Sequence, residues 1–307
     1  MIDNIDLIIY GMISAATPII LASQGALMTG YCGTFNIGLE GMMLLSAFFS
    51  AYIAEITSNL LLGIIGAILI SIIVGIGMIL FTLKLRANNF MLGLALNLLA
   101  VGLTMFLGGW LLGQKGSFIF KNASKLKSIN IPALANIPII NSIVNGHNIF
   151  DLLAIVFTFL FYIFIFRTSY GYRMRAVGKS SWVAKSVGIS CSKYKVIAYV
   201  WCSILCALGG ASLSLPLGMF ASGPVGMVNG RGWLAIAVVI IAQGNPLRVL
   251  MGAWIFGFAS ALTDLLQITT NFSPRLLMAF PFIFAIIITA VYSLFSRSSE
   301  GEIRVGI

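Results

Sequence analysis

Charged residues are scarce in this chain of 307 residues: Asp, Glu, Lys and Arg together make up 8%, whereas 60% of the residues are hydrophobic. A typical soluble domain carries about 25% charged residues, so a soluble architecture is excluded. No stretch is both long and polar enough to form a separate domain. We therefore predict a single transmembrane unit, residues 1–307, with room for about eight to ten spanning helices.

Histidine and cysteine are also rare, with one and four residues respectively. His147 has no partner cluster, so neither a metal site nor a catalytic triad is predicted. The cysteines have no metal-site spacing and are interpreted as small buried hydrophobic residues; they are Cys32, Cys191, Cys202 and Cys206. No paired carboxylates or nucleophile motif indicates an enzyme, and no cofactor is expected.

A nucleotide-binding loop is missing as well. The run 178–180, Gly-Lys-Ser, matches the end of a P-loop, but the first glycine of that motif falls on Arg173 and no β-strand is expected before it. Any ATP chemistry is thus expected in another chain. The excess of Lys and Arg, 18 against 8 acidic residues, fits cytoplasmic loops better than nucleic-acid binding.

Apolar runs separated by polar breaks predict about nine spanning helices. The expected ranges are 7–29, 39–55, 60–83, 90–112, 149–166, 196–217, 233–243, 247–268 and 276–295. The seventh is too short to span as a straight helix, and a glycine-rich turn precedes the second. The fold class is accordingly all-α, a polytopic helical bundle with broken helices.

The charge distribution sets the expected orientation. Segment 167–195 contains Lys and Arg but no acidic residue, which places it in the cytoplasm by the positive-inside rule. Counting helices puts loop 113–148 and the N-terminus outside, and the C-terminal tail, with Arg297 and Arg304, inside. The four lysines of loop 113–148 run against this bias, although longer loops translocate regardless of charge.

Residues 33–44 place a carboxylate, Glu40, and an amide, Asn36, among glycines that include Gly38 and Gly41. Polar groups and irregular backbone at membrane depth need protein or water around them. One interpretation is a helix break that bounds a transport path or gate. The other is a tight turn at the cytoplasmic surface, with Glu40 at a helix N-terminus where a carboxylate is favourable. A structural role for Glu40 is the preferred one.

A weak internal repeat links this turn to a second one. Residues 36–41 follow the first helix, and 229–232 follow the sixth; the second run comprises Asn229, Gly230, Arg231 and Gly232. Because the two preceding helices are expected to run in opposite directions, an inverted repeat with broken helices is one interpretation. Chance similarity between glycine-rich turns is the other.

Three further polar residues fall inside the expected helices: Asn97, Gln243 and Asp264. Asn97 and Gln243 would contact either a polar substrate or a neighbouring helix, and an interhelical hydrogen bond is preferred for each. Asp264 is the costliest of the three, and it lies near the end of its helix.

The basic segment contains a predicted short helix at 182–187. Ser180 or Ser181 suits its N-cap, and Gly188 is placed to end it. Its apolar face consists of Trp182, Val183 and Val187. A capped helix of this kind suits docking of a partner, and an ordinary basic loop is the alternative.

The run 35–43, Phe-Asn-Ile-Gly-Leu-Glu-Gly-Met-Met, resembles a signature of permease subunits of ABC importers. The likeness is to the ribose/branched-chain amino acid permease superfamily, and within it to the branch for nucleosides and simple sugars. Residues 170–189 and 230–246 resemble that family's cytoplasmic coupling segment and late motif, in compatible order and spacing. One departure is Val183-Ala184, where the family commonly has an alanine pair.

The resemblance implies a permease domain in the cell membrane that forms the path for a nucleoside or simple sugar, driven by ATP hydrolysis on a separate subunit. The implied partners are a second permease subunit, cytoplasmic ATP-binding subunits, an extracytoplasmic substrate-binding lipoprotein and membrane lipid, with no nucleic acid. The residues expected to couple to the ATPase are Arg173, Arg175, Gly178, Trp182, Ala184, Val187 and Gly188. The alternative is an ion-coupled secondary carrier of a small polar solute, for which Glu40 and Asp264 would have to supply the ion site.

Overall fold

The computed structural model describes residues 2–113, 116–128, 145–223, 226–269 and 279–296. Its helices are α1 (Ile2–Tyr31), α2 (Leu39–Thr57), α3 (Leu60–Lys84), α4 (Asn89–Leu112), α6 (Ile149–Arg167), α7 (Ser169–Lys179), α8 (Ser181–Ser186), α9 (Cys191–Leu217), α10 (Arg231–Ala242), α11 (Pro246–Thr269) and α13 (Phe280–Ser296). The two strands are β1 (Ser117–Ile119) and β2 (Met219–Ala221). Residues 114–115 and 129–144 of the expected loop 113–148, and the tail with Arg297 and Arg304, lie outside the described residues.

Each of the nine expected ranges overlaps a helix, which confirms the helical bundle. Among the described residues, seven helices are long and apolar enough to cross a membrane, namely α1, α2, α3, α4, α6, α9 and α11. Helix α10 has 12 residues, in keeping with the expectation that its range is too short to span. Helix α13 has 17 residues, so the count of nine crossings stays a prediction, as does the orientation of the termini.

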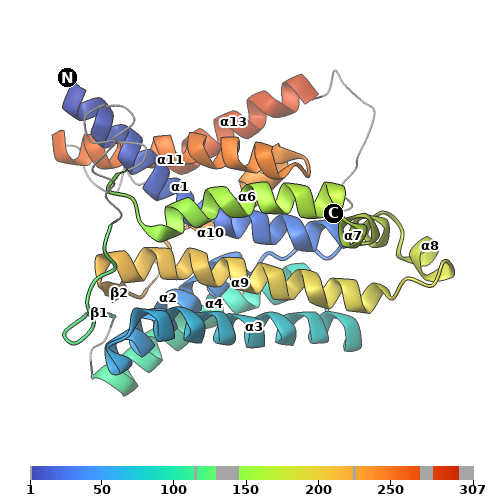
Figure 1. The fold of residues 1–307 in the computed structure, drawn as a ribbon, viewed down its shortest axis with the longest axis horizontal. Coiled ribbons are helices and arrows are strands. Elements are labelled where there is room, and N and C mark those ends of the chain that lie inside the picture. Colours follow the sequence, from blue (N-terminus) through green and yellow to red (C-terminus); the bar gives the residue numbers. More distant parts are fainter. Residues whose placement is uncertain (1, 114–115, 129–144, 224–225, 270–278, 297–307) are drawn as a thin grey trace.

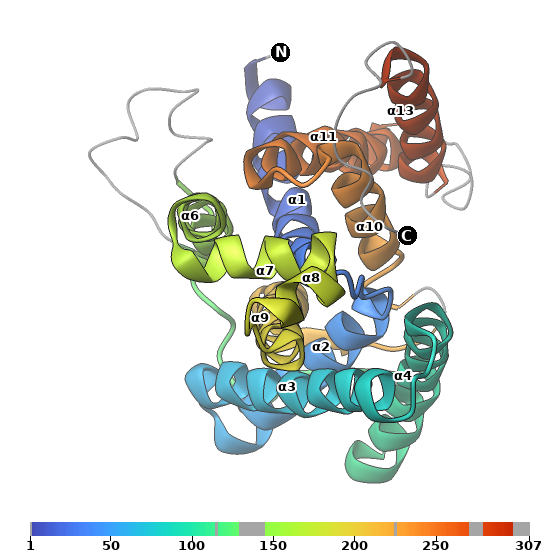
Figure 2. The ribbon, with the colours of Figure 1, turned by 90° about the vertical axis from the view of Figure 1, so that its right-hand side faces the viewer.

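Helix α9 lies between two groups of helices, as the end-on view in Figure 2 shows. It packs against α1 on one side and against α2 and α3 on the other. Helices α6, α10 and α11 gather around α1, whereas α4 packs on α2 and α3. The buried apolar residues form one continuous cluster through these contacts, so the two groups share a core.

Small residues allow the helix backbones to come close. A Cβ on Gly210 of α9 would meet the backbone of Met43 and Ala47 in α2. Across the α3–α9 contact, Ser71 donates a hydrogen bond of 2.8 Å to the carbonyl of Ser203. Such close approaches are typical of helices that pack in a membrane, where there is little hydrophobic force to hold them together.

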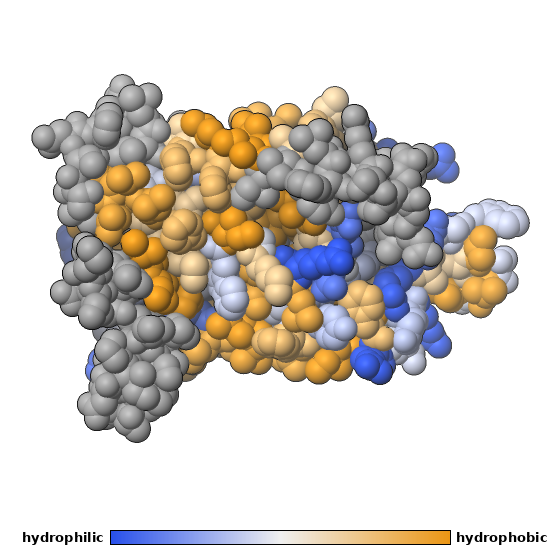
Figure 3. All heavy atoms as spheres, turned by 90° about the horizontal axis from the view of Figure 1, so that it is seen from above, coloured by the Kyte–Doolittle hydropathy of each residue, from blue (hydrophilic) through white to orange (hydrophobic). Residues whose placement is uncertain are grey.

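The flanks of the bundle are apolar and one end is polar (Figure 3). Helix α3 presents Leu61, Ile65, Leu69 and Ile73 at intervals of four residues, and all four are exposed. An exposed stripe of this composition faces lipid or another transmembrane chain rather than water. The surface thus agrees with a polytopic membrane protein.

The two ends of the bundle carry different small elements (Figure 1). Helices α7 and α8 project from one end, and the antiparallel β1–β2 pair, with Phe118 opposite Phe220, lies at the other. Neither α7 nor the strand pair was predicted. Three-residue strands are too short to show a period of two, and Gly171 and Gly178 gave the α7 sequence the composition of a loop.

Candidate functional site: a helix crossing inside the bundle and a short helix at its end

The turn after α1 is shaped by Asn36. Gly33 has a positive φ of 69°, which ends α1 and directs the chain toward α2. The buried Asn36 side chain accepts a hydrogen bond of 2.9 Å from the N–H of Gly38. Its own N–H donates to the hydroxyl of Thr29 at 3.2 Å. Asn36 therefore supplies a hydrogen bond to the backbone between α1 and α2, where the regular helical bonding is interrupted.

Asn97 of α4 completes the start of α2. Its Oδ1 accepts a bond of 2.8 Å from the N–H of Gly41, and its Nδ2 donates to the carbonyl of Ile37 at 3.2 Å. A Cβ on Gly41 would lie 2.8 Å from the carbonyl oxygen of Leu96, so only glycine fits there. Asn97 thus makes the interhelical contact that was one of its two expected roles.

Glu40 joins the two glycine-rich runs that the sequence had related. Its carboxylate accepts hydrogen bonds from the N–H groups of Gly230, at 2.8 Å, and Gly232, at 2.7 Å. These N–H groups belong to the first turn of α10, where a helix leaves its donors unpaired and favours negative charge. Glu40 lies in the first turn of its own helix α2, as expected, and its carboxylate also binds the N-terminus of a second helix, α10.

The backbones of α2 and α10 touch where they begin. A Cβ on Gly232 would lie 2.5 Å from the nitrogen and 2.7 Å from the Cα of Glu40. Asn229 and Gly230 precede this contact with positive φ angles of 45° and 78°, and glycine adopts such angles without strain. We call the meeting of residues 39–41 with residues 230–232 the helix crossing.

Arg231 gives the helix crossing a positive charge. It is half-buried, and one of its guanidinium nitrogens donates to the carbonyl of Met227 at 3.1 Å. It also interacts electrostatically with Asp264 of α11 and with Glu40. Glu40 and Asp264, the two carboxylates that an ion-coupled carrier would have needed for its ion site, therefore share one cation. The sequence held this signal, because Arg231 lies inside the second glycine-rich run.

The helix crossing lies well inside the bundle. Helix α10 runs from it to Gly244, whose carbonyl accepts a hydrogen bond from the hydroxyl of Tyr31 at the end of α1. Twelve residues of helix rise about 18 Å, within an apolar layer about 30 Å thick. Only the turn at Gly33 lies near the end of the bundle, whereas Glu40 lies deeper than the expected surface position.

Helices α2 and α10 leave the helix crossing in opposite directions. Helix α2 runs parallel to α9 toward the β1–β2 end, because Ser50 of α2 meets Ser214 of α9 at 2.8 Å. Helix α10 runs toward the α7 end. Both helices thus begin at one point inside the bundle, and their relation as broken helices of an inverted repeat stays a prediction.

Helix α8 has the caps that the sequence predicted. The hydroxyl of Ser180 accepts a bond of 3.3 Å from the N–H of Val183. Gly188 has a φ of 79°, and its N–H donates to the carbonyl of Lys185 at 3.0 Å. The helix between them, Ser181–Ser186, therefore has a fixed length although it is only six residues long.

The apolar face of α8 is open to its surroundings. Trp182 is 80% exposed and Val187 is 70% exposed, whereas Ala184 is buried against the rest of the segment. Helix α7 attaches this projection to the bundle: a Cβ on Gly178 would meet the carbonyl of Tyr31 and the nitrogen of Gly33. The projection therefore rests directly on the end of α1.

The basic side chains of α7 are held in place. The Arg175 guanidinium lies 4.8 Å from the ring centroids of both Phe166 and Tyr172. Arg173 donates to the Tyr194 hydroxyl at 3.3 Å, and this hydrogen bond raises the pKa of Arg173. Arg173 therefore stays charged throughout the physiological range.

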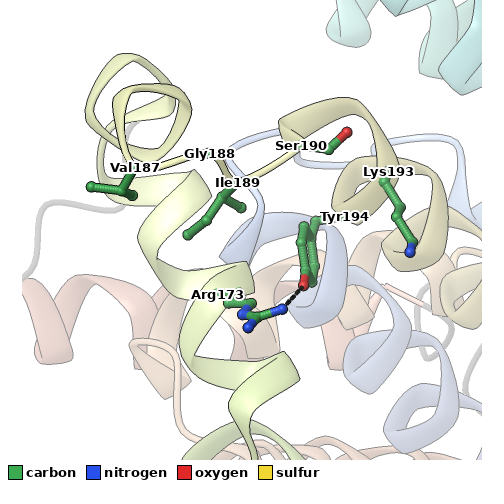
Figure 4. A pocket seen from close by; sticks show the side chains of 7 residues that line it. All are labelled: Arg173, Val187, Gly188, Ile189, Ser190, Lys193 and Tyr194. Carbon is green, nitrogen blue, oxygen red and sulfur yellow. Dashed lines mark hydrogen bonds between the residues drawn. The ribbon is translucent and has the colours of Figure 1, made fainter.

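A groove of about 420 Å³ lies between α7 and the start of α9. In Figure 4, Arg173 and Tyr194 point toward one another across it. Its lining consists of Arg173, Val187, Gly188, Ile189, Ser190, Lys193 and Tyr194. Within the described ranges, no three His, Cys, Asp or Glu side chains gather in a way that could hold a metal ion.

Comparison with known proteins identifies the same family as the resemblance found in the sequence. Residues 7–294 match the model of the family described as branched-chain amino acid transport system / permease component. The chain belongs to this permease family. The resemblance first drawn from residues 35–43 is thereby confirmed over nearly the whole length.

Individual relatives are similar over most of their length. A nucleoside ABC transporter permease of Lactococcus lactis is 28% identical over 306 residues, covering 95% of this chain and 93% of the relative. A guanosine ABC transporter permease of Bacillus subtilis is 27% identical over 273 residues, with coverages of 85% and 83%. A putative glucose ABC transporter permease of Haloferax volcanii is 29% identical over 255 residues, with coverages of 81% and 74%.

The protein is therefore a membrane-embedded permease subunit of an ABC transport system rather than an enzyme. ATP binding and substrate binding belong to other components of that system. Within the permease, the structure joins the two runs expected at the path or gate through Glu40, which binds Gly230 and Gly232. The other expected residues lie beside this contact in the chain: Asn36, Gly38, Gly41 and Asn229. It places Gln243 apart from them, exposed at the C-cap of α10, where its Oε1 accepts from Arg248 at 3.4 Å.

Proposed function

We propose that this permease carries a nucleoside or a simple sugar into the cell along a path bounded by the helix crossing. The relatives support this substrate class, since their names specify nucleosides, guanosine and glucose. A half-buried Arg231 with two acidic neighbours supports the path, because charged groups at this depth usually face a polar cavity.

The end that bears α7 and α8 faces the cytoplasm in this proposal. The charges support it: segment 167–195 is basic throughout, with no acidic residue, as is usual for cytoplasmic loops. The β1–β2 end then faces outward, together with the N-terminus. The C-terminus lies in the cytoplasm if α13 crosses the membrane.

The ATP-binding subunit docks on α8. The observation that carries this assignment is the exposed apolar face of a capped helix at the polar end of the bundle. Large exposed apolar side chains rimmed by polar residues are typical of interaction sites. Trp182 is the anchor, since tryptophan dominates the energetics of many interfaces.

A continuous series of contacts leads from α8 to the helix crossing. Helix α7 rests on Tyr31 through Gly178, Tyr31 bonds to Gly244 at the end of α10, and Glu40 binds the start of α10. Movement of α8 would therefore reach α10 through α7 and Tyr31. We propose that this series couples ATP hydrolysis to opening of the path.

The arrangement of Glu40 argues against an ion-coupled carrier. Both of its oxygens accept hydrogen bonds from N–H groups, and a positive side chain lies nearby. A cation site would require the carboxylate to face a cation rather than hydrogen-bond donors.

A second permease subunit, identical or homologous, and a substrate-binding lipoprotein complete the proposed complex.

Reconstitution in proteoliposomes tests the function. The permease, its ATP-binding subunit and its substrate-binding protein should take up radiolabelled guanosine, ribose or glucose only when ATP is enclosed on the α8 side. Uptake that continues without the ATP-binding subunit and follows an ion gradient would refute the proposal. The preferred solute among the three identifies the substrate class.

Trp182→Asp tests the docking surface. Loss of an aromatic anchor weakens an interface by about 2 kcal/mol or more, so ATP-driven uptake and co-purification of the ATP-binding subunit should fall at least about tenfold. Leu85→Asp is the matched control, since Leu85 is also a large apolar side chain that is exposed, at the C-cap of α3. Equal yields of complex from both variants would remove α8 from the interface.

A further inference from the structure

The segment that follows β1 is fixed to the outer end of the bundle by its backbone. Phe118 of β1 is buried, with its ring 6.3 Å from that of Phe48 and 5.9 Å from that of Phe220. After β1, the N–H of Phe120 donates to the carbonyl of Gly218 at 2.9 Å, and that of Leu126 to Leu215 at 3.2 Å. Residues 117–126 therefore follow the end of α9 and β2 closely.

Glu55, at the other end of α2 from Glu40, binds the same segment. Only 8% of it is exposed, and its two oxygens accept hydrogen bonds from three consecutive N–H groups. The distances are 3.0 Å to Lys121, 3.1 Å to Asn122 and 3.3 Å to Ala123. A carboxylate with several backbone donors is a strong, charge-assisted contact, so this stretch has one preferred conformation.

Three lysines stand out from this fixed backbone. Lys121, Lys125 and Lys127 are all exposed, and a Cβ on Gly218 would meet the stem of Lys125, so that stem lies against the turn that leads into β2. In the part of the chain that the structure describes, no acidic side chain forms an ion pair with any of them. We call residues 121–127 the basic platform.

A basic surface on the outer side is unusual for a membrane protein. Lys and Arg are normally concentrated in cytoplasmic loops, and the anionic surface potential that attracts polybasic segments belongs to the cytoplasmic leaflet. Electrostatic attraction to lipid headgroups also does not need a backbone that is held in one conformation. A preorganised charged surface instead suits a protein partner with complementary charge, because less ordering is needed on binding.

We propose that the basic platform is the docking surface for a carboxylate-bearing face of the substrate-binding protein. This inference rests on the proposed function, which supplies the outward orientation and the partner. The platform steers the loaded binding protein to the outer end of the path. Glu55 holds the backbone at Lys121, and the bond from Leu126 to Leu215 holds it between Lys125 and Lys127. The interaction is electrostatic, so it weakens as salt concentration rises.

The test measures binding of the purified substrate-binding protein to the complete permease complex in nanodiscs. The triple variant Lys121→Glu/Lys125→Glu/Lys127→Glu should raise Kd at least about tenfold, and the binding protein should no longer stimulate ATP hydrolysis. Lys84→Glu is the control, because Lys84 is an exposed lysine at the C-terminal end of α3, far from the basic platform. It should change Kd by less than about twofold. Lys127→Glu alone provides a milder variant if the triple variant is poorly folded.

Two results would overturn the inference. One is an unchanged Kd in the triple variant and in Lys127→Glu. The other is a loss of binding that occurs in nanodiscs containing phosphatidylglycerol but not in nanodiscs of pure phosphatidylcholine. That result would show that the platform binds anionic lipid instead. The proposed function is judged separately, by ATP-driven uptake of the wild-type complex, and its failure would appear there whatever the Kd.

Discussion

Helix α2 carries a carboxylate near each end, and each one binds the backbone of a distant segment. Glu40 binds two N–H groups at the start of α10, and Glu55 binds three N–H groups after β1. In both cases a carboxylate accepts hydrogen bonds from backbone N–H groups that have no carbonyl partner within a helix or strand. The two sites therefore use the same physical device at opposite ends of one helix.

Their surroundings differ, and the difference indicates their roles. Glu40 lies where two helices begin and where glycine allows backbone contact, with the charge of Arg231 nearby. Glu55 binds residues that are not glycine, and its segment has additional backbone bonds to the end of α9 and β2. Glu40 thus holds one narrow contact between two helices, whereas Glu55 is one of several anchors of a surface.

Gly232→Ala should have the largest effect, because it disturbs the close backbone contact between α2 and α10, which has no counterpart at Glu55. The new Cβ would lie 2.5 Å from the nitrogen of Glu40. Because this neighbour is backbone and cannot rotate away, the cost is at or above the upper end of the about 1–3 kcal/mol that overpacking usually causes. We expect uptake per inserted protein to fall at least about tenfold and the unfolding midpoint to drop. Uptake and thermal unfolding in detergent are the measurements.

The matched control is Gly77→Ala in α3, where a Cβ would meet nothing within 4 Å. Alanine is favoured over glycine in a helix by about 1 kcal/mol, so this variant should be neutral or slightly more stable. Wild-type uptake by Gly232→Ala would mean that the helix crossing is not part of the path.

Glu40→Gln is expected to come next. The amide keeps one acceptor oxygen but presents an NH₂ group to the second N–H, and it removes the charge opposite Arg231. A hydrogen bond to a charged group contributes about 1.5–3 kcal/mol, so stability should fall by that amount and uptake with it. A double-mutant cycle with Arg231→Gln separates the two causes: purely additive losses would show that the cation is irrelevant to Glu40.

The sequence predicted the long helices because each is an unbroken apolar run, and it predicted the ends of α8 because Ser180 and Gly188 are specific local signals. It related the two glycine-rich runs but could not predict that Glu40 binds the other run rather than its own helix. The bond from Gly230 to Glu40 joins residues that are 190 positions apart in the chain, and no local pattern reports it.

The β1–β2 end shows the same limit of what the sequence can predict. Glu55 lies within an apolar helix near its end and has no partner nearby in the sequence, while its partners at 121–123 are backbone groups that carry no residue signature. The three-residue strands depend on each other for their hydrogen bonds. Tertiary contacts of this kind become visible only when the chain is folded.

Glu55→Gln should have a moderate effect confined to the β1–β2 end of the bundle. Loss of a charge-assisted bond of about 1.5 kcal/mol should speed amide hydrogen exchange at residues 121–123 about tenfold. The β1–β2 pair and the two bonds to Gly218 and Leu215 remain, so the global unfolding midpoint should change little. Exchange measured by mass spectrometry checks this, and a global loss of stability as large as that of Glu40→Gln would contradict the proposed difference.

Asp264→Asn should have the smallest effect. Asp264 is exposed on α11 and reaches Arg231 only through its charge, and exposed charge pairs contribute about 0–1 kcal/mol. Uptake should therefore change less than about fivefold, measured beside Glu40→Gln in the same vesicles. If both variants lost the same fraction of uptake, the charge balance of Arg231 with its two acidic neighbours would control transport. The hydrogen bonds from N–H groups to Glu40 would then not be decisive for uptake. Glu40 and Glu55 would then share the same hydrogen-bond pattern without sharing its role, because only Glu55 would depend on its bonds to N–H groups.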